Sequence, residues 1–490
     1  MDILRLYSAF KECGSVTTDS RAISGGEMFF GLKGENFDGN EYALKALEAG
    51  ARYAVVDENS AAAASGNSRV ISVSDTLAAL QALARHHREN TFVDGKRLTV
   101  IGLTGTNGKT TTKELITRVL SVKYNVTSTQ GNLNNDIGVP LSVLGINSKT
   151  QIAVIEMGAS HPDDIEKLVK VSEPDYGIIT NVGKGHLLGF GSFDGVKKAK
   201  GKLYDYILEH GKGIFLNADD PILVGMAAER KGLKAIEYGV NYWGAIVLSS
   251  DADHPFVRMA IPDSVTDPVA EPVKATGNPS ARELAEATNT SVPEPVEGPI
   301  TDQDCIENLL CLETHLAGAY NANNIATAIA VGLHFGVSLE GALQAVSEYI
   351  PKNNRSQLEK TGRNILIEDA YNANPTSMAA ALDNLASVHA PLKAAMLGEM
   401  RELGEESVPE HIVVLGKLAS MNLDLVCLVG EEFRKALDSV SDPVEVTSKM
   451  KWFPTSDDLV AWLKENPVSG HTILIKGSRG NRMENVLSEL

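Results

Sequence analysis

The sequence predicts an α/β protein of three domains, and two observations lead to this prediction. Short apolar runs alternate with helical patterns along most of the chain. A chain of 490 residues is also longer than one hydrophobic core usually organises, so several domains are expected. Many of the apolar runs are nearly continuous, which is typical of parallel strands covered by helices on both faces.

The first domain is expected to be a small α/β unit spanning residues 1–95. Apolar runs at 28–32 and 53–56 flank a helical pattern at 41–51. A polar stretch at 86–97 precedes the next apolar run, and we place the domain boundary there.

The second domain, residues 96–350, is expected to carry a mostly parallel sheet. Ligands bind such sheets at the carboxyl ends of the strands, so motifs that follow these strands are candidate site residues. The helix after the first strand has its apolar residues on one face. The expected strands are 98–104, 152–157, 176–180 and 213–217, and the apolar face of the helix is Leu115, Ile116, Val119 and Leu120.

The third domain, residues 351–490, shows the same alternation and is expected to be a Rossmann-like α/β domain. Its expected strands are 364–370, 394–400, 423–430 and 471–478.

One segment of the second domain, residues 261–303, does not fit the α/β pattern. It is rich in Pro, Glu, Ala and Thr and has few large apolar residues, which is the composition of a disordered insert. Its prolines oppose regular sheet pairing, and we expect it to carry no catalytic group.

Charge and cysteine usage limit the possible functions. The formal net charge of −18 argues against nonspecific nucleic-acid binding, which requires a basic surface. Acidic and basic residues within the first twelve positions interrupt the apolar stretch that a signal peptide needs, so none is expected there. The sequence contains no apolar run long enough for a membrane span. The four cysteines are scattered without metal-site spacing, so reduced thiols in a cytoplasmic protein are expected.

The strongest motif is the glycine-rich turn after the strand at 98–104. Such a turn lets backbone N–H groups and a helix N-terminus converge on a phosphate. The lysine is expected to reach the β- and γ-phosphates of a nucleotide, and one threonine hydroxyl to hold Mg²⁺. Leu103 occupies the first glycine position of the usual phosphate loop, so an ordinary glycine-rich turn is the alternative. The candidate phosphate-binding residues are Gly105, Thr106, Asn107, Gly108, Lys109, Thr110 and Thr111.

Other candidates in the second domain also follow strand ends. Glu156 ends a strand, where a carboxylate suits Mg²⁺, although a helix-capping acid is the alternative. His186 lies in the loop after the strand at 176–180, where a lone histidine is usually structural. A group of closely spaced lysines is most simply interpreted as a solvated helix face: Lys197, Lys198, Lys200 and Lys202.

The third domain repeats this placement of polar residues. Asp369 ends a strand and precedes an Asn-rich turn. Lys476, Arg479 and Arg482 gather after the last strand, where a basic cluster suits a carboxylate or a phosphate. A plain surface loop is the alternative.

Taken in order, these motifs resemble the Mur ligase family of bacterial cell-wall synthesis. The resemblance covers nearly the whole chain apart from residues 261–303. It includes TTDSRAISGGEMFFGLKGENFDGNEY (17–42), the phosphate loop, QGNLNNDIGVPL (130–141), EMGAS, TNVGKGHLLGFGS, LNADDP and GAYNANNIATAIA (318–330). IEDAYNANPTSM (367–378), LGEMRELGEES (397–407) with His411, and IKGSRGNRME resemble the branch that adds D-alanyl-D-alanine. An Asp-Asn-Pro-Arg-like motif, expected of the diaminopimelate- or lysine-adding branch, is absent from the sequence.

The resemblance implies a role for each matching residue. Lys109 and Thr110 would hold the ATP phosphates and one Mg²⁺, with Glu156 and His186 as further metal ligands. Lys200 matches a lysine that carries a CO₂-derived carbamate, which would make it an anionic metal ligand. The catalytic set is thus Lys109, Glu156, His186 and Lys200. The nucleotide contacts would also include Asn217 at the adenine and, from the third domain, Arg355 and Asp369. The substrate contacts would be Ser20, Arg21, Asn134, Asn135, Asn372, Asn374, Lys476 and Arg479.

The resemblance therefore implies a monomeric, cytoplasmic ligase that uses ATP and Mg²⁺. It would charge the carboxylate of UDP-N-acetylmuramoyl-tripeptide as an acyl phosphate and join it to D-alanyl-D-alanine. Two alternatives stay open. One is another amide ligase of this architecture, such as the third-residue-adding muramyl ligase or a folylpolyglutamate synthase, and the other is a nucleotide-binding regulatory protein without turnover. The chain departs from the family at Lys202, where an acid is usual, and at Tyr320, where a histidine is common. The sequence does not reveal whether the tripeptide ends in diaminopimelate or lysine.

Overall fold

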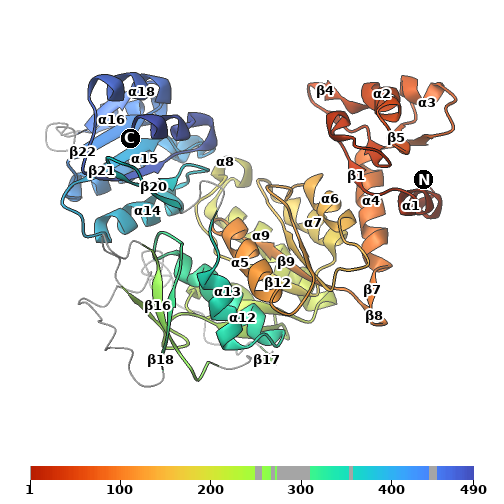
Figure 1. Ribbon diagram of the computed structural model, residues 1–490, viewed down its shortest axis with the longest axis horizontal. Coiled ribbons are helices and arrows are strands. Elements are labelled where there is room, and N and C mark those ends of the chain that lie inside the picture. Colours follow the sequence, from red (N-terminus) through yellow and green to blue (C-terminus); the bar gives the residue numbers. More distant parts are fainter. Residues whose placement is uncertain (1, 249–255, 266–270, 273–308, 352–356, 441–449) are drawn as a thin grey trace.

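The computed structural model describes residues 2–248, 256–265, 271–272, 309–351, 357–440 and 450–490. Three α/β units follow one another along the chain, and the first and third lie on either side of the second (Figure 1). The predicted three-domain α/β fold is confirmed. Within the described residues, none of the helices combines the length and apolarity needed to cross a membrane.

The first unit is built on a parallel four-stranded sheet. Its elements are α1 (Ile3–Lys11), β1 (Val16–Thr17), η1 (Ser20–Ala22), β2 (Met28–Phe30), β3 (Lys33–Gly34), β4 (Phe37–Asp38), η2 (Gly39–Tyr42), α2 (Ala43–Glu48), β5 (Tyr53–Asp57), α3 (Ala61–Ala64), β6 (Val70–Val73), α4 (Thr76–Glu89), β7 (Phe92–Val93) and β8 (Lys96–Arg97). The strand order is β1-β2-β5-β6, and the predicted apolar runs form the two central strands. The predicted helix at 41–51 is confirmed as the shorter α2, preceded by the 3₁₀ turn η2.

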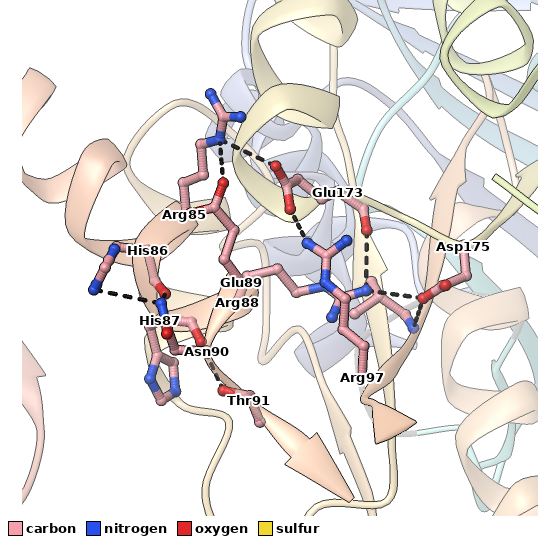
Figure 2. A network of polar contacts seen from close by, with 11 residues as sticks. Arg85, His86, His87, Arg88, Glu89, Asn90, Thr91, Arg97, Glu173 and Asp175 are labelled. Atoms are coloured by element: carbon pink, nitrogen blue, oxygen red, sulfur yellow. Dashed lines mark hydrogen bonds and ion pairs between the residues drawn. The ribbon is translucent and has the colours of Figure 1, made fainter. Parts of the chain in front are cut away.

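The polar stretch at 86–97, where the domain boundary was predicted, forms regular structure. Its first residues end α4 and its last residues form the hairpin β7–β8. Arg88 is 0% exposed, and its Nη2 donates to the Glu173 carbonyl oxygen (3.2 Å) and to Asp175 Oδ2 (2.8 Å). Arg85 and Arg97 form ion pairs with the Glu173 carboxylate (Figure 2). The stretch is polar because it carries an ion-pair network that joins the first unit to the second.

The second unit is built on a seven-stranded sheet. Its elements are β9 (Thr99–Thr104), α5 (Lys109–Leu120), β10 (Val126–Ser128), α6 (Gly138–Leu144), β11 (Ile152–Glu156), α7 (Asp164–Ser172), β12 (Tyr176–Ile179), α8 (Leu187–Phe190), α9 (Phe193–His210), β13 (Gly213–Asn217), α10 (Pro221–Ala228), β14 (Lys234–Tyr238), β15 (Ile246–Leu248), β16 (Arg258–Pro262), β17 (Glu271–Pro272), β18 (Leu309–Glu313), α12 (Asn321–His334) and α13 (Leu339–Ser347). The order is β10-β11-β9-β12-β13-β14-β17, parallel except for β17.

Side chains of the central strand β9 alternate between the two faces of this sheet, as the strand period of two requires. Ile101 and Leu103 join a core with apolar residues of α5, α12 and α13. Val100 joins the core on the opposite face, to which α6, α7 and α9 contribute. Helices therefore cover both faces, and the carboxyl edge of the sheet remains open for a site.

The expectation for residues 261–303 is wrong at its beginning. Ile261 and Pro262 end β16, which pairs with β15 and β18 in a separate antiparallel sheet, and Ile261 is fully buried. Glu271 and Pro272 form β17 at the edge of the main sheet. Proline is compatible with both positions because one lies at a strand end and the other on an edge strand. Residues 266–270 and 273–303 lie outside the described part of the chain.

The third unit contains a six-stranded sheet. Its elements are β19 (Gln357–Lys360), β20 (Ile365–Asp369), α14 (Pro375–Ser387), β21 (Lys393–Gly398), η4 (Gly404–Glu406), α15 (Ser407–Ser420), β22 (Leu425–Val429), α16 (Glu431–Ser439), β23 (Met450–Phe453), α18 (Ser456–Glu465), β24 (Thr472–Lys476), η5 (Arg479–Asn481) and η6 (Met483–Glu489). The order is β19-β20-β24-β21-β22-β23, with β19 antiparallel and the rest parallel. Each apolar run predicted as a strand in this domain forms one.

Candidate active site

A cavity of about 1110 Å³ lies where the carboxyl ends of the second unit's strands face the third unit. Both units contribute side chains to its wall, which is mixed polar and apolar. Most of the residues predicted from the sequence line it: Thr106, Asn107, Gly108, Lys109, Thr110, Thr111, Asn134, Asn135, Glu156, His186, Asn217, Asp369, Asn372, Asn374 and Lys476.

The phosphate-loop-like turn connects β9 to α5 and depends on its glycines. Gly108 has a φ of 77°, a conformation that favours glycine, and an added Cβ would lie 2.6 Å from Asn324 Oδ1. Gly105 lies against Thr180, where a Cβ would come within 1.9 Å of the hydroxyl oxygen. The N-cap position of α5 is Gly108, which has no side chain to cap the first N–H groups of the helix. These N–H groups and the helix dipole make the turn suitable for an anion.

Lys109 folds back over this turn. Its Nζ donates to the carbonyl oxygens of Gly105 (2.9 Å) and Thr106 (3.1 Å), which holds the ammonium above the loop. Asn181, which follows β12, braces the turn from the side because its Oδ1 accepts from Asn107 N (3.0 Å). A phosphate seated on the N–H groups would therefore find a positioned cation beside it.

Glu156 is buried at the end of β11 and is surrounded by donors. Thr110 Oγ1 lies 3.1 Å from Glu156 Oε2, and Asn134 Nδ2 donates to Oε1 at 2.8 Å. The Glu156 backbone N–H donates to Thr129 Oγ1 (3.0 Å). A hydroxyl and a carboxylate adjacent to a phosphate site are the hard oxygen ligands that Mg²⁺ takes alongside phosphates. Among the described residues, no group of three or more His, Cys, Asp or Glu is arranged for a metal.

Lys200 lies in α9 behind the phosphate-loop turn and is only 2% exposed, so the expectation of a solvated lysine face is wrong for this residue. Its Nζ donates to the Gly105 carbonyl oxygen (3.0 Å). Burial lowers the pKa of the Lys200 ammonium well below its usual value, and the charge of Lys109 adds to this effect. The sequence placed Lys200 near the loop only through the family resemblance, because burial cannot be read from a run of lysines.

His186 precedes α8 with a φ of 53° and lines the cavity. Its Nδ1 contacts the carboxylate of Glu402, a residue of the third unit. Burial lowers the pKa of His186, while the neighbouring Glu402 carboxylate works in the opposite direction. The ring thus bridges two units in this structure.

The third unit contributes an ion pair at the carboxyl edge of its sheet. Asp369 and Lys476 are register partners at the ends of β20 and β24, and their charged groups are in contact. Lys476 Nζ also donates to the Asn372 carbonyl oxygen (3.1 Å). Lys476 is almost completely buried, so the pair is one fixed feature of the cavity wall.

Further polar contacts hold the third unit against the second beside the cavity. Asn374 Nδ2 donates to Asn107 Oδ1 at 2.8 Å, and the reverse amide contact measures 3.4 Å. Lys184 Nζ forms an ion pair with Glu410 Oε1 (2.7 Å). The phosphate-loop turn is therefore directly bonded to the third unit.

Some predicted residues lie elsewhere. Ser20 and Arg21 form η1 in the first unit, where Arg21 pairs with Asp19. Arg479 stacks its guanidinium 5.8 Å from the Tyr371 ring in the third unit. Arg355 lies outside the described residues.

The two departures from the family pattern occupy different places. Lys202 pairs with Glu166 of α7 (3.4 Å), whereas Tyr320 lines the cavity.

The sequence reasoning missed several polar residues that hold this site together. Asn324, from α12, accepts a hydrogen bond from Thr112 Oγ1 (3.0 Å) and lies against Gly108. Asn321 in turn accepts from Asn324 Nδ2 (2.8 Å). The cluster of asparagines at the start of an otherwise apolar helix was the available signal. Lys184 gave no comparable signal because its partner, Glu410, is distant in sequence.

Three family models match the chain. The model described as Mur ligase family, catalytic domain matches residues 12–88, the Mur ligase middle domain matches 103–253, and the Mur ligase, glutamate ligase domain matches 354–479. The curated UDP-N-acetylmuramoyl-tripeptide–D-alanyl-D-alanine ligase of Bacillus subtilis is 32% identical over 477 residues, which cover 97% of this chain and 92% of that protein. The protein of the same name from Escherichia coli is 28% identical over 484 residues, covering 97% and 93%.

Solved structures show the same architecture. MurF from Acinetobacter baumannii has a TM-score of 0.78 and 27% identity, with 100% of this chain and 98% of that chain covered. The MurF ligase from Thermotoga maritima in complex with ADP has a TM-score of 0.73 and 23% identity, with the same coverage, and it supports the fold.

Proposed function

The chain belongs to the Mur ligase family, and from this premise we propose that it joins D-alanyl-D-alanine to UDP-N-acetylmuramoyl-tripeptide. The reaction consumes ATP, yields ADP and phosphate, and supplies a peptidoglycan precursor. Relatives of nearly the same length carry the name of this ligase, which supports the assignment over the other amide ligases considered.

One observation carries the proposal. A single cavity brings the phosphate-loop-like turn and Glu156 of the second unit to the same space as Asp369, Asn374 and Lys476 of the third unit. A ligase needs its nucleotide, its acyl donor and its amine within one enclosed volume. A regulatory nucleotide-binding protein would not need polar groups from a further unit opposite the phosphates.

In the first chemical step, the tripeptide carboxylate attacks the γ-phosphorus of ATP and ADP leaves, which gives an acyl phosphate. Lys109, held over the turn by two backbone carbonyls, is positioned to neutralise charge on the transferred phosphoryl group. The N–H groups at the start of α5 would bind the phosphates that remain on ADP.

In the second step, the amine of D-alanyl-D-alanine attacks the acyl carbon and phosphate leaves. We assign the dipeptide to the third-unit side of the cavity, near Asn372 and Asn374. Lys476 and Arg479 would provide positive charge for its carboxylate, although Asp369 already compensates Lys476. Ser20 and Arg21 would contact the uridine diphosphate end in the first unit, and Asn134 and Asn135 would line the path between the two ends.

Mg²⁺ fits this site because Thr110 and Glu156 present adjacent oxygens next to the phosphate position. His186 and a carbamate on Lys200 would add ligands. When bound, the ion would supply charge neutralisation for the phosphoryl transfer. Asn217 would contact the adenine, and Asp369 and Arg355 would approach the nucleotide from the third unit.

We propose that the protein works as a monomer in the cytoplasm. The described cysteines Cys13 and Cys427 are free thiols, which is usual in a reducing compartment.

The decisive experiment is a coupled assay of phosphate release from ATP. We expect release only when UDP-muramoyl-tripeptide and D-alanyl-D-alanine are both present, with formation of the pentapeptide product by mass spectrometry. Running the assay with lysine- and diaminopimelate-ending tripeptides identifies the natural third residue. Release with a single amino acid or with a folate acceptor in place of the dipeptide would assign the chain to another ligase.

Lys109→Ala tests the phosphate-loop assignment. Loss of one positioned electrostatic stabiliser is expected to lower kcat by roughly 100- to 1000-fold. We expect the fold to be kept, and circular dichroism and melting temperature of the same variant check this. Near-normal kcat in a folded Lys109→Ala protein contradicts the assignment.

A further inference from the structure

A second lysine of α5, Lys113, lies one turn beyond Lys109 but is buried. It is 2% exposed, and its Nζ donates to the Thr129 carbonyl oxygen at 2.7 Å. The nearest acid is its chain neighbour Glu114, at 3.8 Å. Burying an ammonium is unfavourable unless it is paired and hydrogen-bonded, so this position is unusual for a lysine that served packing alone.

Thr129, whose carbonyl oxygen accepts this bond, connects the ends of the strands β10 and β11. It follows β10 directly and is 0% exposed. Its backbone N–H donates to the Val154 carbonyl oxygen (3.1 Å), and its hydroxyl oxygen accepts from the Glu156 backbone N–H (3.0 Å). Lys113 therefore fixes the residue that in turn fixes the main chain of Glu156.

The segment after Thr129 reaches the cavity. Residues 130–136 are mostly exposed, and Asn134 and Asp136 are among those that line the cavity. Asn134 Nδ2 donates to Glu156 Oε1 (2.8 Å), and its carbonyl oxygen accepts from Gly158 N (2.7 Å). An exposed loop of this kind keeps its position through the few residues that are bonded to the rest of the protein. A change at Thr129 would therefore alter the positions of both Asn134 and the Glu156 carboxylate.

We propose that Lys113 is a positioning residue for the ligation, which keeps Glu156 and the 130–136 loop in register with the phosphate-loop turn. Lys109 and Lys113 share one rigid helix, so the helix carries the phosphate site and the anchor of the facing loop together. Lys113 makes this link through a direct bond to the main chain, without a side chain in the cavity wall. This inference rests on the proposed function where it names the UDP-linked substrate. The metal and nucleotide measurements below do not depend on that function.

The test compares Lys113→Met, which keeps the length and removes the charge, with the wild type and with Lys123→Met. Lys123 is a matched control because its Nζ also donates to backbone carbonyls, those of Phe335 and Gly336, but near the surface and away from the cavity. Calorimetry measures ADP binding without metal and then in a titration of Mg²⁺. Steady-state kinetics give KM and kcat for each substrate.

We expect Lys113→Met to bind metal-free ADP as the wild type does, because the turn itself is intact. The Mg²⁺ concentration at half-saturation and the KM for the UDP-linked substrate should each rise about tenfold or more, as is typical when a residue that supports a metal ligand is lost. Lys113→Arg, which keeps a charged donor, should recover part of both effects. Lys123→Met should leave all these values unchanged.

The proposal is overturned if Lys113→Met weakens metal-free ADP binding and Mg²⁺ binding equally, or if it changes stability alone. Thr129→Val keeps the carbonyl but removes the hydroxyl that accepts from Glu156 N. Thr129→Val should raise the Mg²⁺ concentration at half-saturation, and this variant can be measured also where Lys113→Met fails to fold. An unchanged Mg²⁺ concentration at half-saturation in Thr129→Val overturns the proposal. If the wild type does not ligate, the proposed function fails, whereas the calorimetric comparison still decides the role of Lys113.

Discussion

Four lysines lie close together on α9, and their surroundings differ more than their spacing suggests. Lys197, Lys198 and Lys202 remain accessible to solvent, whereas Lys200 is buried with its ammonium on the Gly105 carbonyl oxygen. A buried cation beside the cation of Lys109 is unfavourable for a site that must also hold a divalent metal. Conversion of this amine to a carbamate by CO₂ would replace the positive charge by a negative one.

We therefore predict that Lys200→Ala lowers kcat by roughly 100-fold or more, since an anionic ligand beside the phosphates is lost. Formate or acetate added to the assay should restore part of the activity by occupying the space of the carbamate. Steady-state kinetics with and without these acids is the measurement. Normal activity of Lys200→Arg, which keeps the positive charge and cannot form the carbamate, contradicts the prediction.

His411 makes the stability of the third unit depend on pH. It is 0% exposed, its Nε2 accepts from Met400 N (3.0 Å), and its Nδ1 lies 2.7 Å from the Ser407 carbonyl oxygen, which requires the neutral ring protonated at Nδ1. Burial lowers the pKa of His411 below its value in the unfolded chain, against weaker opposing effects of the Ser407 hydrogen bond and nearby glutamates.

The sign of the pH effect follows from this lowered pKa. Below about pH 6.5 the unfolded chain binds a proton at His411 that the folded protein does not, so stability is lost as the pH falls. We predict that the free energy of unfolding of the wild type, relative to His411→Gln, declines by at most about 1.4 kcal/mol per pH unit between pH 6.5 and the folded pKa. Urea unfolding of both proteins from pH 5 to 8 measures this difference. A difference that stays constant over this range contradicts the prediction.

At the residue scale, local motifs were sufficient to find residues that line the cavity where a side chain and its neighbours are close in sequence. Lys109 and Thr110 follow a strand and a glycine turn, and the structure places both at the cavity. The partner of His186, Glu402, comes from another unit and could not be read from the sequence. The burial of Lys113 was invisible for the same reason, since Thr129 approaches it only after the strands pair.

Among the elements, apolar runs located the buried strands well because both faces of each sheet are covered. The run at 213–217 forms β13 with the same bounds. The pattern failed at β16 and β17, where proline was read as evidence against strands. Ile261 is fully buried between residues of its small sheet and belongs to the core that contains α5 and α12.

This revised view of β16 gives a prediction. Ile261→Ala should lower the free energy of unfolding by about 2–5 kcal/mol, because it removes a fully buried side chain and leaves a cavity. Leu310→Ala, at the register partner of Ile261 but only half-buried, should cost less. Denaturant unfolding of the two variants is the measurement. Equal and small losses in the free energy of unfolding of both variants would mean that Ile261 belongs to the insert that the composition suggested.

At the scale of the whole molecule, α4 connects the first unit to the second as one continuous helix. At its start, Thr76 N donates to Asp57 Oδ1 (2.9 Å) in the first unit. Near its end, Arg88 bonds to Asp175 and to the main chain of Glu173 in the second unit (Figure 2). Fourteen residues of α-helix span about 21 Å, so α4 sets a fixed separation between the two units.

Fixed separation matters for a substrate whose uridine diphosphate end and reacting carboxylate would lie in different units. We expect conformational change at the third unit, whose described contacts with the second include the side-chain pairs Asn107–Asn374 and Lys184–Glu410. The sequence indicated three domains, but it did not reveal which pair is rigidly joined. The ion pairs of Arg88 supply that information, whereas the sequence showed Arg88 only as part of the polar stretch at the predicted domain boundary.

Arg88→Met tests whether α4 holds the two units in register. Asp175 keeps Lys212 and the Val100 N–H as partners, so the loss in the free energy of unfolding should be near the low end for a broken buried pair, about 3 kcal/mol. The KM for the UDP-linked substrate should rise, because its two ends are no longer held at one distance, while the dissociation constant of ADP should not change. Arg85→Met removes an exposed partner of Glu173 from the same helix and should cost less than about 1 kcal/mol with normal KM. If Arg88→Met lowers stability but leaves the KM for the UDP-linked substrate equal to that of Arg85→Met, the ion-pair network stabilises the fold without positioning the substrate.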